Sequence, residues 1–67
     1  MHKEIWTIGR ILQWTEQYFQ SKEMDTPRLD GELLLSHVLG KDRIYLYTHY
    51  DQPLIQDELD AFRPLVQ

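Results

Sequence analysis

Cysteine is absent from this 67-residue chain, and several other residue types that support chemistry are scarce. Without cysteine, these residues cannot form a disulfide, a thiolate nucleophile or a cysteine-ligated metal site. Glycine occurs only three times, singly, at Gly9, Gly31 and Gly40. Loops that hold phosphates need several glycines close together, so no such loop is present. These absences exclude disulfide-stabilised scaffolds and nucleotide-binding loops within the 67 residues.

Groups that could perform acid–base or nucleophilic catalysis are poorly placed. The three histidines lie far apart in the sequence, at His2, His37 and His49. Ser36 and His37 are neighbours and therefore diverge on a helix. Asp30 and Glu32 point different ways, so we interpret them as partners of a helix dipole or as a solvated face. We predict no catalytic, cofactor-binding or metal-binding residue in this chain.

Positive charge is also scarce. Seven Lys and Arg residues stand against eleven Asp and Glu, which gives a net charge of −4 and a pI near 5.1. A surface that binds nucleic acid is expected to be basic, so we predict no nucleic-acid partner. No apolar run approaches the roughly 20 residues of a membrane-spanning helix, and the N-terminus lacks the apolar segment of a signal peptide. We expect a soluble, cytoplasmic protein without a membrane partner, which the absence of cysteine also fits.

Apolar and aromatic side chains are nevertheless sufficient for a folded domain. Hydrophobic residues make up 42% of the chain, and they include two tryptophans, four tyrosines and two phenylalanines. Disordered segments have far fewer such residues. A chain of this length can form one small core, which buries only about 60% of the surface of the unfolded chain. We predict a single domain over residues 1–67.

The stretch from Asp25 to Gly40 carries signals for both ends of a helix. Asp25 or Thr26 can act as the N-cap, and Pro27 suits the first helical position because it lacks an N–H and has a helical φ. Gly40 suits the left-handed residue that closes a helix. Apolar residues spread around most of this helix, at Leu29, Leu33, Leu34, Leu35, Val38 and Leu39. A helix that is apolar on nearly all sides is typically buried, so we predict that the other helices surround it.

Two helices flank this central one. Thr7 can cap a helix that runs to about Lys22 and has an apolar stripe at helical spacing. The stripe holds Ile8, Ile11, Leu12, Thr15, Tyr18 and Phe19, and the opposite face holds Gly9, Arg10, Gln13, Glu16, Gln17 and Gln20. Asp42 can cap a short helix from Arg43 to about His49. The same residues have β propensity, but a lone strand would lack a partner for its backbone groups, so we favour a helix.

A last helix is expected from about Gln56. Its apolar face holds Ile55, Leu59, Phe62 and Val66. No Ser, Thr, Asp or Asn stands at the expected cap position, and Pro64 removes a backbone hydrogen bond, so we expect the proline to kink or end the helix. The predicted fold is therefore all-α: a small bundle of four short helices, or five, around a central buried helix.

Two features could bind a partner protein. The first is an aromatic cluster made of Tyr45, Tyr47, His49 and Tyr50. Tyrosine is favoured at interfaces, although packing at the edge of the core with the hydroxyl groups in water is the competing interpretation. The second is Arg28, which can form a forked pair with a carboxylate. A salt bridge from Arg28 to Glu32, four residues later, is the competing interpretation here.

The run DTPRLDGELLLSHVLG resembles a signature of the HemK/PrmC family of release-factor glutamine methyltransferases. In that family, (D/E)-S-P-R-x-D-A-E-x-L-L-x-H-V-x-G marks the second helix of a small N-terminal helical domain. An aromatic-rich first helix precedes the run, and Lys41 and Arg43 follow it, as in the family. A further pattern shared with the family consists of Pro53, Leu54, Glu58, Leu59 and Phe62. The sequence departs from the family at Gly31, which replaces an alanine, at Ile55-Gln56, which replaces a Thr-Pro cap, and at Pro64.

This resemblance implies a bundle of about five helices joined to a Rossmann-like domain. That domain binds S-adenosylmethionine and methylates the glutamine of the GGQ loop in peptide chain release factors. Its Asn-Pro-Pro-Tyr motif and glycine-rich loop do not occur in these 67 residues. The resemblance thus implies a non-catalytic docking domain that acts in translation termination. Its partners would be a peptide chain release factor and the C-terminal methyltransferase domain of the same parent, with S-adenosylmethionine bound by the parent.

Two alternatives stay open at this point. The chain could be a free-standing helical protein–protein interaction module, dimeric through its tyrosines and Trp14. It could also be a helix-turn-helix DNA binder, because residues 40–42 form a short turn between two predicted helices. The acidic composition and the single base, Arg43, in the would-be reading helix disfavour the DNA binder.

Overall fold

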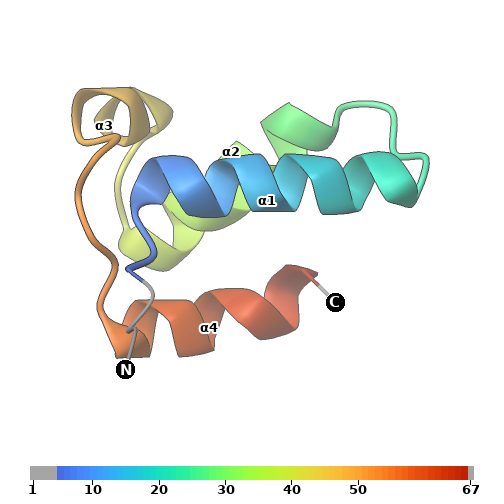
Figure 1. The fold of residues 1–67 in the computed structure, drawn as a ribbon. Coiled ribbons are helices and arrows are strands. Elements are labelled where there is room, and N and C mark those ends of the chain that lie inside the picture. Colours follow the sequence, from blue (N-terminus) through green and yellow to red (C-terminus); the bar gives the residue numbers. More distant parts are fainter. Residues whose placement is uncertain (1–4, 67) are drawn as a thin grey trace.

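The computed structural model describes residues 5–66, which form four helices (Figure 1). They are α1 (Ile8–Ser21), α2 (Pro27–Leu39), α3 (Arg43–Thr48) and α4 (Gln56–Val66). Within the described residues the only β-type pairing is an isolated bridge between Thr7 and Pro53. The predicted all-α bundle is confirmed, and residues 43–48 are helical as expected. His2 lies outside the described residues.

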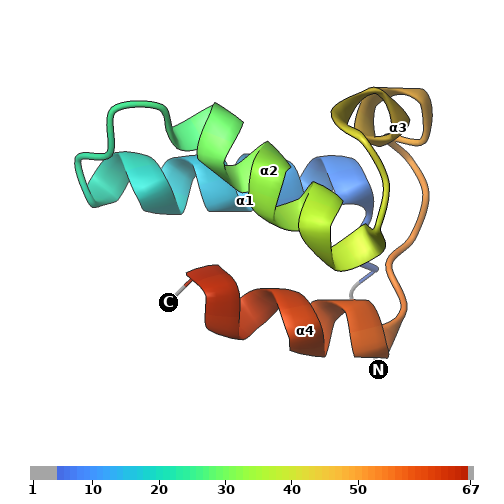
Figure 2. The same cartoon turned by 180° about the vertical axis from the view of Figure 1, so that it is seen from behind.

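Helix α2 is the central element of the bundle, because it contacts each of the other three helices. Figure 1 shows α1 and α4 running in the same direction on the near side, with α2 behind them and α3 at one end. Figure 2, from behind, shows α2 crossing in front of α1. The chain thus forms a bundle in which α1 and α4 are held together mainly through their contacts with α2.

Most helix ends follow the capping signals in the sequence, although Thr26, the N-cap residue of α2, makes no side-chain cap bond. Thr7 Oγ1 accepts a hydrogen bond from the backbone N–H of Arg10 at 3.2 Å, and Asp42 Oδ1 accepts one from Tyr45 N–H at 3.0 Å. Pro27 is the first residue of α2, and Gly40 closes it with φ of 66° and ψ of 31°. Such side-chain and glycine caps satisfy backbone groups that have no partner inside the helix.

Two helix ends use signals that the sequence did not reveal. Two residues after the end of α1, Glu23 adopts the left-handed backbone conformation, with φ of 60°. The N–H groups of Glu23 and Met24 then donate to the carbonyls of Gln20 and Phe19, at 3.0 and 3.2 Å, which is the Schellman arrangement. At the start of α4, Glu58 Oε1 accepts from the N–H of Ile55 at 3.0 Å, as in half of a capping box.

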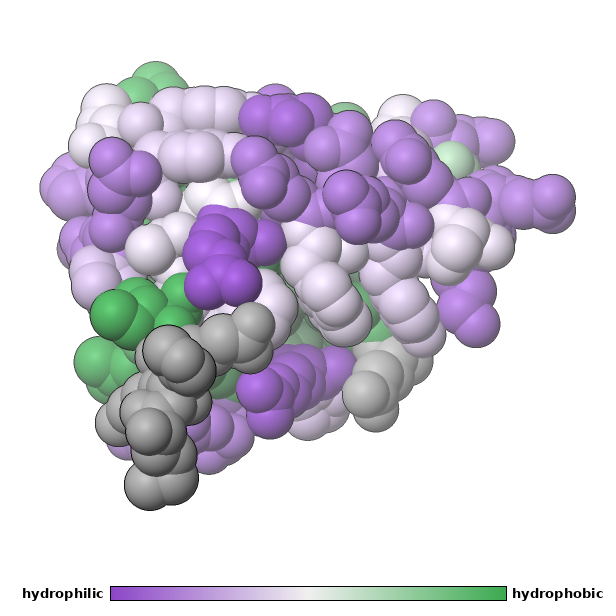
Figure 3. All heavy atoms as spheres, viewed as in Figure 1, coloured by the Kyte–Doolittle hydropathy of each residue, from purple (hydrophilic) through white to green (hydrophobic). Residues whose placement is uncertain are grey.

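The proline in α4 does not end that helix, which continues past Pro64 to Val66. Leu59, Phe62 and Val66 are buried, as predicted. Ile55 is exposed, so the prediction that it shares the buried face is wrong. Figure 3 shows a mostly polar face on which hydrophobic side chains gather near the start of α4.

The core draws on all four helices and on Leu54. Its buried apolar residues are Ile8, Ile11, Leu12, Phe19, Leu35, Leu46, Leu54, Leu59, Phe62 and Val66. The prediction that α2 is buried on nearly all sides is wrong: Leu29 is exposed and Leu33 is 51% exposed, and only Leu35 among the leucines of α2 is fully buried. A helix apolar all round does not specify its inner face, and the inner face of α2 is instead the side of Gly31, Glu32 and Leu35.

Gly9 is buried rather than on the outer face of α1, which corrects another expectation. A Cβ at this position would overlap the ring of Tyr50. The backbone N–H of Gly9 also donates to the carbonyl of Tyr50 at 2.8 Å. The segment after α3 therefore lies directly on the first turn of α1, and only glycine leaves room for the tyrosine ring.

Candidate functional site

Glu32 is a buried carboxylate at the centre of a polar cluster between α2 and α3. The residue is 1% exposed. Arg43 Nε donates to Glu32 Oε1 at 3.0 Å, and the Tyr47 hydroxyl donates to Glu32 Oε2. Arg28 Nε lies 3.3 Å from the same Oε2. Both carboxylate oxygens thus have charged or polar partners, as a buried charge requires.

The two guanidinium groups that pair with this buried carboxylate also reach the surface. The side chains of Arg28 and Arg43 are 48% and 50% exposed. Arg28 Nη1 also donates to Glu16 Oε1 on α1 at 3.3 Å, and its Cζ lies 5.8 Å from the centre of the Tyr47 ring. We call the surface formed by Arg28, Arg43 and Tyr47 the arginine face.

Arg28 keeps its positive charge in this setting. The Tyr47 hydroxyl oxygen, which accepts from Arg28 Nε at 3.4 Å, raises the pKa of Arg28 above its ordinary value. The carboxylates of Glu16 and Glu32 act in the same direction, and partial burial opposes them. The arginine face therefore presents two fixed cations and one phenol ring, balanced from beneath by two carboxylates.

Such an arrangement is suited to binding and holds no group that is set up to react. Guanidinium groups form forked, charge-assisted hydrogen bonds with carboxylates and donate to carbonyl oxygens. The attachment of both arginines to Glu32 reduces the side-chain entropy that they would lose on binding. Tyrosine and arginine are both enriched at protein–protein interfaces. These residues are thus suited to binding a protein surface.

The structure divides the five residues that the sequence singled out. Arg28 and Tyr47 meet on the arginine face, and Tyr47 stacks on Tyr50 with ring centres 6.5 Å apart. Tyr45 and His49 form a separate pair, stacked at 3.9 Å, and the Tyr45 hydroxyl donates to Gln52 Oε1 at 3.0 Å. Tyr45 and Tyr50 both pack against the core. The aromatic residues therefore form no single surface cluster.

Sequence reasoning identified Arg28 and its pairing with Glu32 but missed the burial of Glu32. The competing interpretation, a salt bridge from Arg28 to Glu32, is confirmed. The interpretation of Glu32 as a dipole partner or solvated residue is wrong, because its side chain is buried. The available signal was spacing: Glu32 lies four residues after Arg28 and three before the buried Leu35, so the inner face of α2 passes through it. Arg43, on the next helix, was not expected to contribute.

Residues 5–66 offer neither a metal site nor a membrane-spanning helix. In that range, no group of three His, Cys, Asp or Glu side chains could hold a metal ion. Among the same residues, no helix has the length and apolar character needed to cross a membrane.

Comparison with known proteins identifies relatives for nearly the whole chain. A family model described as the PrmC N-terminal domain matches residues 10–67. The chain is 49% identical over 63 residues to a release factor glutamine methyltransferase of Geobacter sulfurreducens, covering 94% of this chain and 22% of that protein. It is 45% identical over 62 residues to the protein of that name from Rhodopirellula baltica, covering 92% of this chain and 21% of the relative.

A third relative, the release factor glutamine methyltransferase of Chlorobaculum tepidum, is 44% identical over 61 residues, covering 91% of this chain and 21% of the relative. The chain thus spans about a fifth of the length of the curated relatives it matches. No solved structure gives a significant match.

Proposed function

The chain belongs to the PrmC N-terminal domain family, and we propose that it is the docking domain of a protein-glutamine methyltransferase that acts on peptide chain release factors. The observation that carries this proposal is the family match over residues 10–67, together with relatives that are named release factor glutamine methyltransferases. Because the matched region is only about a fifth of those relatives, methyl transfer is assigned to a further part of the parent protein.

S-adenosylmethionine is assigned to the parent protein, beyond the described residues. The hollow lined by Trp6, Ile11, Trp14 and Arg63 would place a guanidinium against the cofactor's sulfonium cation. It also offers no carboxylate for the ribose hydroxyls among the described residues that line it. This hollow therefore does not fit the cofactor, and methyl transfer is left to the part of the parent that lies outside this chain.

Docking would act by bringing the substrate glutamine close to the methyl donor. The arginine face offers two cations and a tyrosine in fixed positions, which suits an acidic surface of a release factor. Contact between the arginine face and the release factor would orient the GGQ loop in the catalytic domain. This orientation would lower the entropic cost of the reaction. The domain would also contact that catalytic domain within the parent. In this proposal the chain itself performs recognition only.

The alternatives receive less support. A free-standing, dimeric interaction module is not favoured by the match to relatives in which this region is a small part of a longer protein. The helix-turn-helix interpretation remains disfavoured by charge, because the chain has a net charge of −4 and Arg43 is the single base in the would-be reading helix.

The direct test is calorimetric titration of a purified release factor into the 67-residue chain. We expect saturable binding that weakens with added salt, because the arginine face is charged. Deletion of residues 1–67 from the full-length parent is expected to reduce methylation of the intact release factor. If the deletion left that methylation unchanged, the docking role would be lost.

A further inference from the structure

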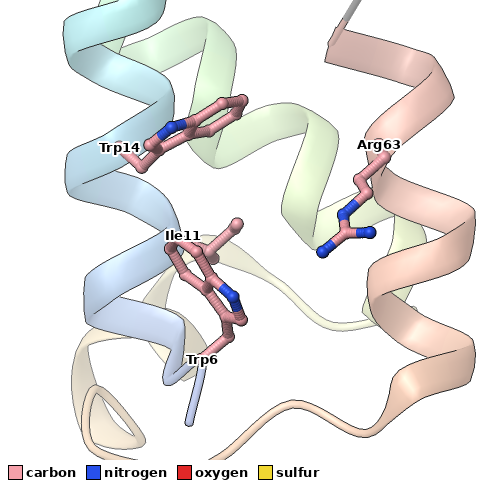
Figure 4. Close-up of a pocket in the computed structure, with 4 residues that line it drawn as sticks. All are labelled: Trp6, Ile11, Trp14 and Arg63. Atoms are coloured by element: carbon pink, nitrogen blue, oxygen red, sulfur yellow. The ribbon is translucent and has the colours of Figure 1, made fainter. Parts of the chain in front are cut away.

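A second surface is hollowed between α1 and α4. A cavity of about 330 Å³ is lined by Trp6, Ile11, Trp14 and Arg63. Figure 4 shows Trp6, Ile11 and Trp14 on the α1 side, and Arg63 extending from α4 toward them. A neighbouring hollow of about 210 Å³ shares both tryptophans. We call the two hollows together the tryptophan groove.

The walls of the tryptophan groove combine apolar rings with exposed surface. Ile11 belongs to the core, but the Trp14 side chain stays 41% exposed, stacked on Tyr18 with ring centres 5.5 Å apart. Trp6 is only partly buried. Large aromatic side chains that remain exposed beside a hollow are typical anchors of binding surfaces. Both tryptophans of the chain lie here.

The charge of the tryptophan groove is opposite to that of the chain. The chain has a net charge of −4 and eleven acidic residues. None of the described residues that line the groove is acidic, whereas Arg63 and Arg10 both line it. Gln13 and Gln17 complete its polar wall. Cations placed around an apolar hollow in an otherwise acidic domain favour a partner with negative charge next to an apolar side chain.

The direction of the flanking helices suggests the shape of that partner. Helices α1 and α4 run in the same direction (Figures 1 and 2). The larger hollow has lining residues on both helices, whereas the smaller hollow is lined by Trp6 and residues of α1. Grooves between helices commonly bind an amphipathic helix that places apolar side chains at helical spacing in the hollow. We propose that the tryptophan groove binds an amphipathic helical segment of a partner protein, with an apolar side chain against Trp6 and Trp14 and a carboxylate paired with Arg63.

This inference is separate from the proposed docking at the arginine face. It does not require the partner to be a release factor, and either proposal can fail without the other. The groove also provides its own probe, because the indole N–H groups of Trp6 and Trp14 give two nuclear magnetic resonance signals in a region free of backbone amides. Binding in the groove must move these two signals.

The test uses the 67-residue chain and alanine-based peptides of about 15 residues, long enough to form a helix. Each peptide carries an apolar anchor (leucine, methionine or phenylalanine) and a glutamate one helical turn later. In the matched peptides, lysine replaces the glutamate. We expect at least one glutamate peptide to shift both indole signals with saturation, and its lysine counterpart to bind about tenfold more weakly, the size of a charge-assisted contact of about 1.4 kcal/mol.

Two charge variants localise the binding. Arg63→Gln is expected to lower the affinity for the glutamate peptide by about tenfold. Arg63→Glu is expected to make the affinity for the glutamate peptide no higher than that for the lysine peptide. Lys41→Gln makes the same change of charge at a residue that lines neither hollow, and it should leave the affinity unchanged.

Four results would overturn the inference. The first is that no glutamate peptide binds, and the second is that glutamate and lysine peptides bind equally. The third is an equal loss of affinity in Lys41→Gln and Arg63→Gln, which would indicate general charge attraction. The fourth is sedimentation that reveals a dimer whose indole signals the peptides cannot move, which would make a second copy of the chain the occupant.

Discussion

Glu32 on α2 accepts a hydrogen bond from the hydroxyl of Tyr47 on α3, fifteen residues later in the chain. This contact, together with the ion pairs of Glu32 to Arg28 and Arg43, ties α3 to α2. It also fixes the side chains that form the arginine face. The stability of the domain and the geometry of the proposed binding surface are therefore linked through one carboxylate.

Replacement of Glu32 by glutamine tests that link. Glu32→Gln removes the charge but keeps the shape, and the two arginines, being half-exposed, can return to water. We expect the free energy of unfolding to fall by about 2 kcal/mol, the size of a lost set of hydrogen bonds to a charged group. Urea unfolding followed by circular dichroism measures this change.

The matched control is Asp30→Asn, which neutralises a nearby carboxylate on the same helix. Asp30 accepts a hydrogen bond from the Thr26 hydroxyl at 3.2 Å and lies near the N-terminus of α2. Loss of the Asp30 charge is expected to lower the free energy of unfolding by less than about 1 kcal/mol. Equal effects of the two substitutions would contradict the central place of Glu32.

A methyl group added at Gly9 should destabilise the domain, although alanine favours a helix by about 1 kcal/mol relative to glycine. The new Cβ would overlap the Tyr50 ring. We expect Gly9→Ala to lower the free energy of unfolding by about 2 kcal/mol, as overpacking does. Addition of Tyr50→Leu to the same chain should recover part of that loss, which a double-mutant cycle from thermal melts would measure.

Gly31→Ala provides the comparison for Gly9→Ala. At Gly31 the new Cβ would meet Thr15 Cγ2 at 3.1 Å, a tight contact with a side chain that can shift. Its effect on stability should be smaller than that of Gly9→Ala. The opposite order would contradict the close approach of Tyr50 to α1.

The end of α1 offers a stabilising substitution. Glu23 adopts φ of 60°, a conformation that glycine reaches without a steric penalty. Glu23→Gly is expected to raise the free energy of unfolding by up to about 1 kcal/mol, since the Schellman bonds stay in place. Glu23→Ala removes the same charge but keeps the strained conformation, so it should give no such gain. Urea titrations of the two variants, compared with the unaltered chain, decide the matter.

The helices were predictable because their boundaries depend on local chemistry. The side chains of Thr7 and Asp42 accept hydrogen bonds from backbone N–H groups three residues later. Pro27 lacks an N–H that would have no partner, and Gly40 adopts the left-handed conformation that closes α2. The structure confirms these four predicted signals. The start of α4 was less clear because its cap is the side chain of Glu58 reaching backward. That bond depends on a rotamer, which a search for Ser, Thr, Asp or Asn at the cap position cannot detect.

The candidate site was less predictable because it depends on which face of α2 turns inward. Six apolar residues surround that helix, so its pattern leaves the inner face undecided. Contacts with α1 and α3 determine which face of α2 turns inward. Thr15 approaches Gly31, and Arg43 and Tyr47 form hydrogen bonds with Glu32. Those contacts join residues far apart in the sequence. As a result Leu33 faces outward and Glu32 inward, the reverse of what side-chain polarity suggests.

The central claim, that this domain docks a release factor, predicts an effect that depends on the size of the substrate. The full-length parent should be assayed with an intact release factor and with a short peptide that carries the GGQ sequence. In this proposal a short peptide cannot contact the arginine face and the catalytic domain together, so it would report methyl transfer without docking.

The decisive measurement is kcat/KM for both substrates in the parent carrying Arg28→Gln and Arg43→Gln together with Glu32→Gln, so that no buried carboxylate is left without its cations. We predict a fall of about tenfold or more for the intact release factor, mainly through a higher KM, and no comparable fall for the peptide. An equal fall for both substrates would contradict the account, and so would unchanged kcat/KM for the intact factor.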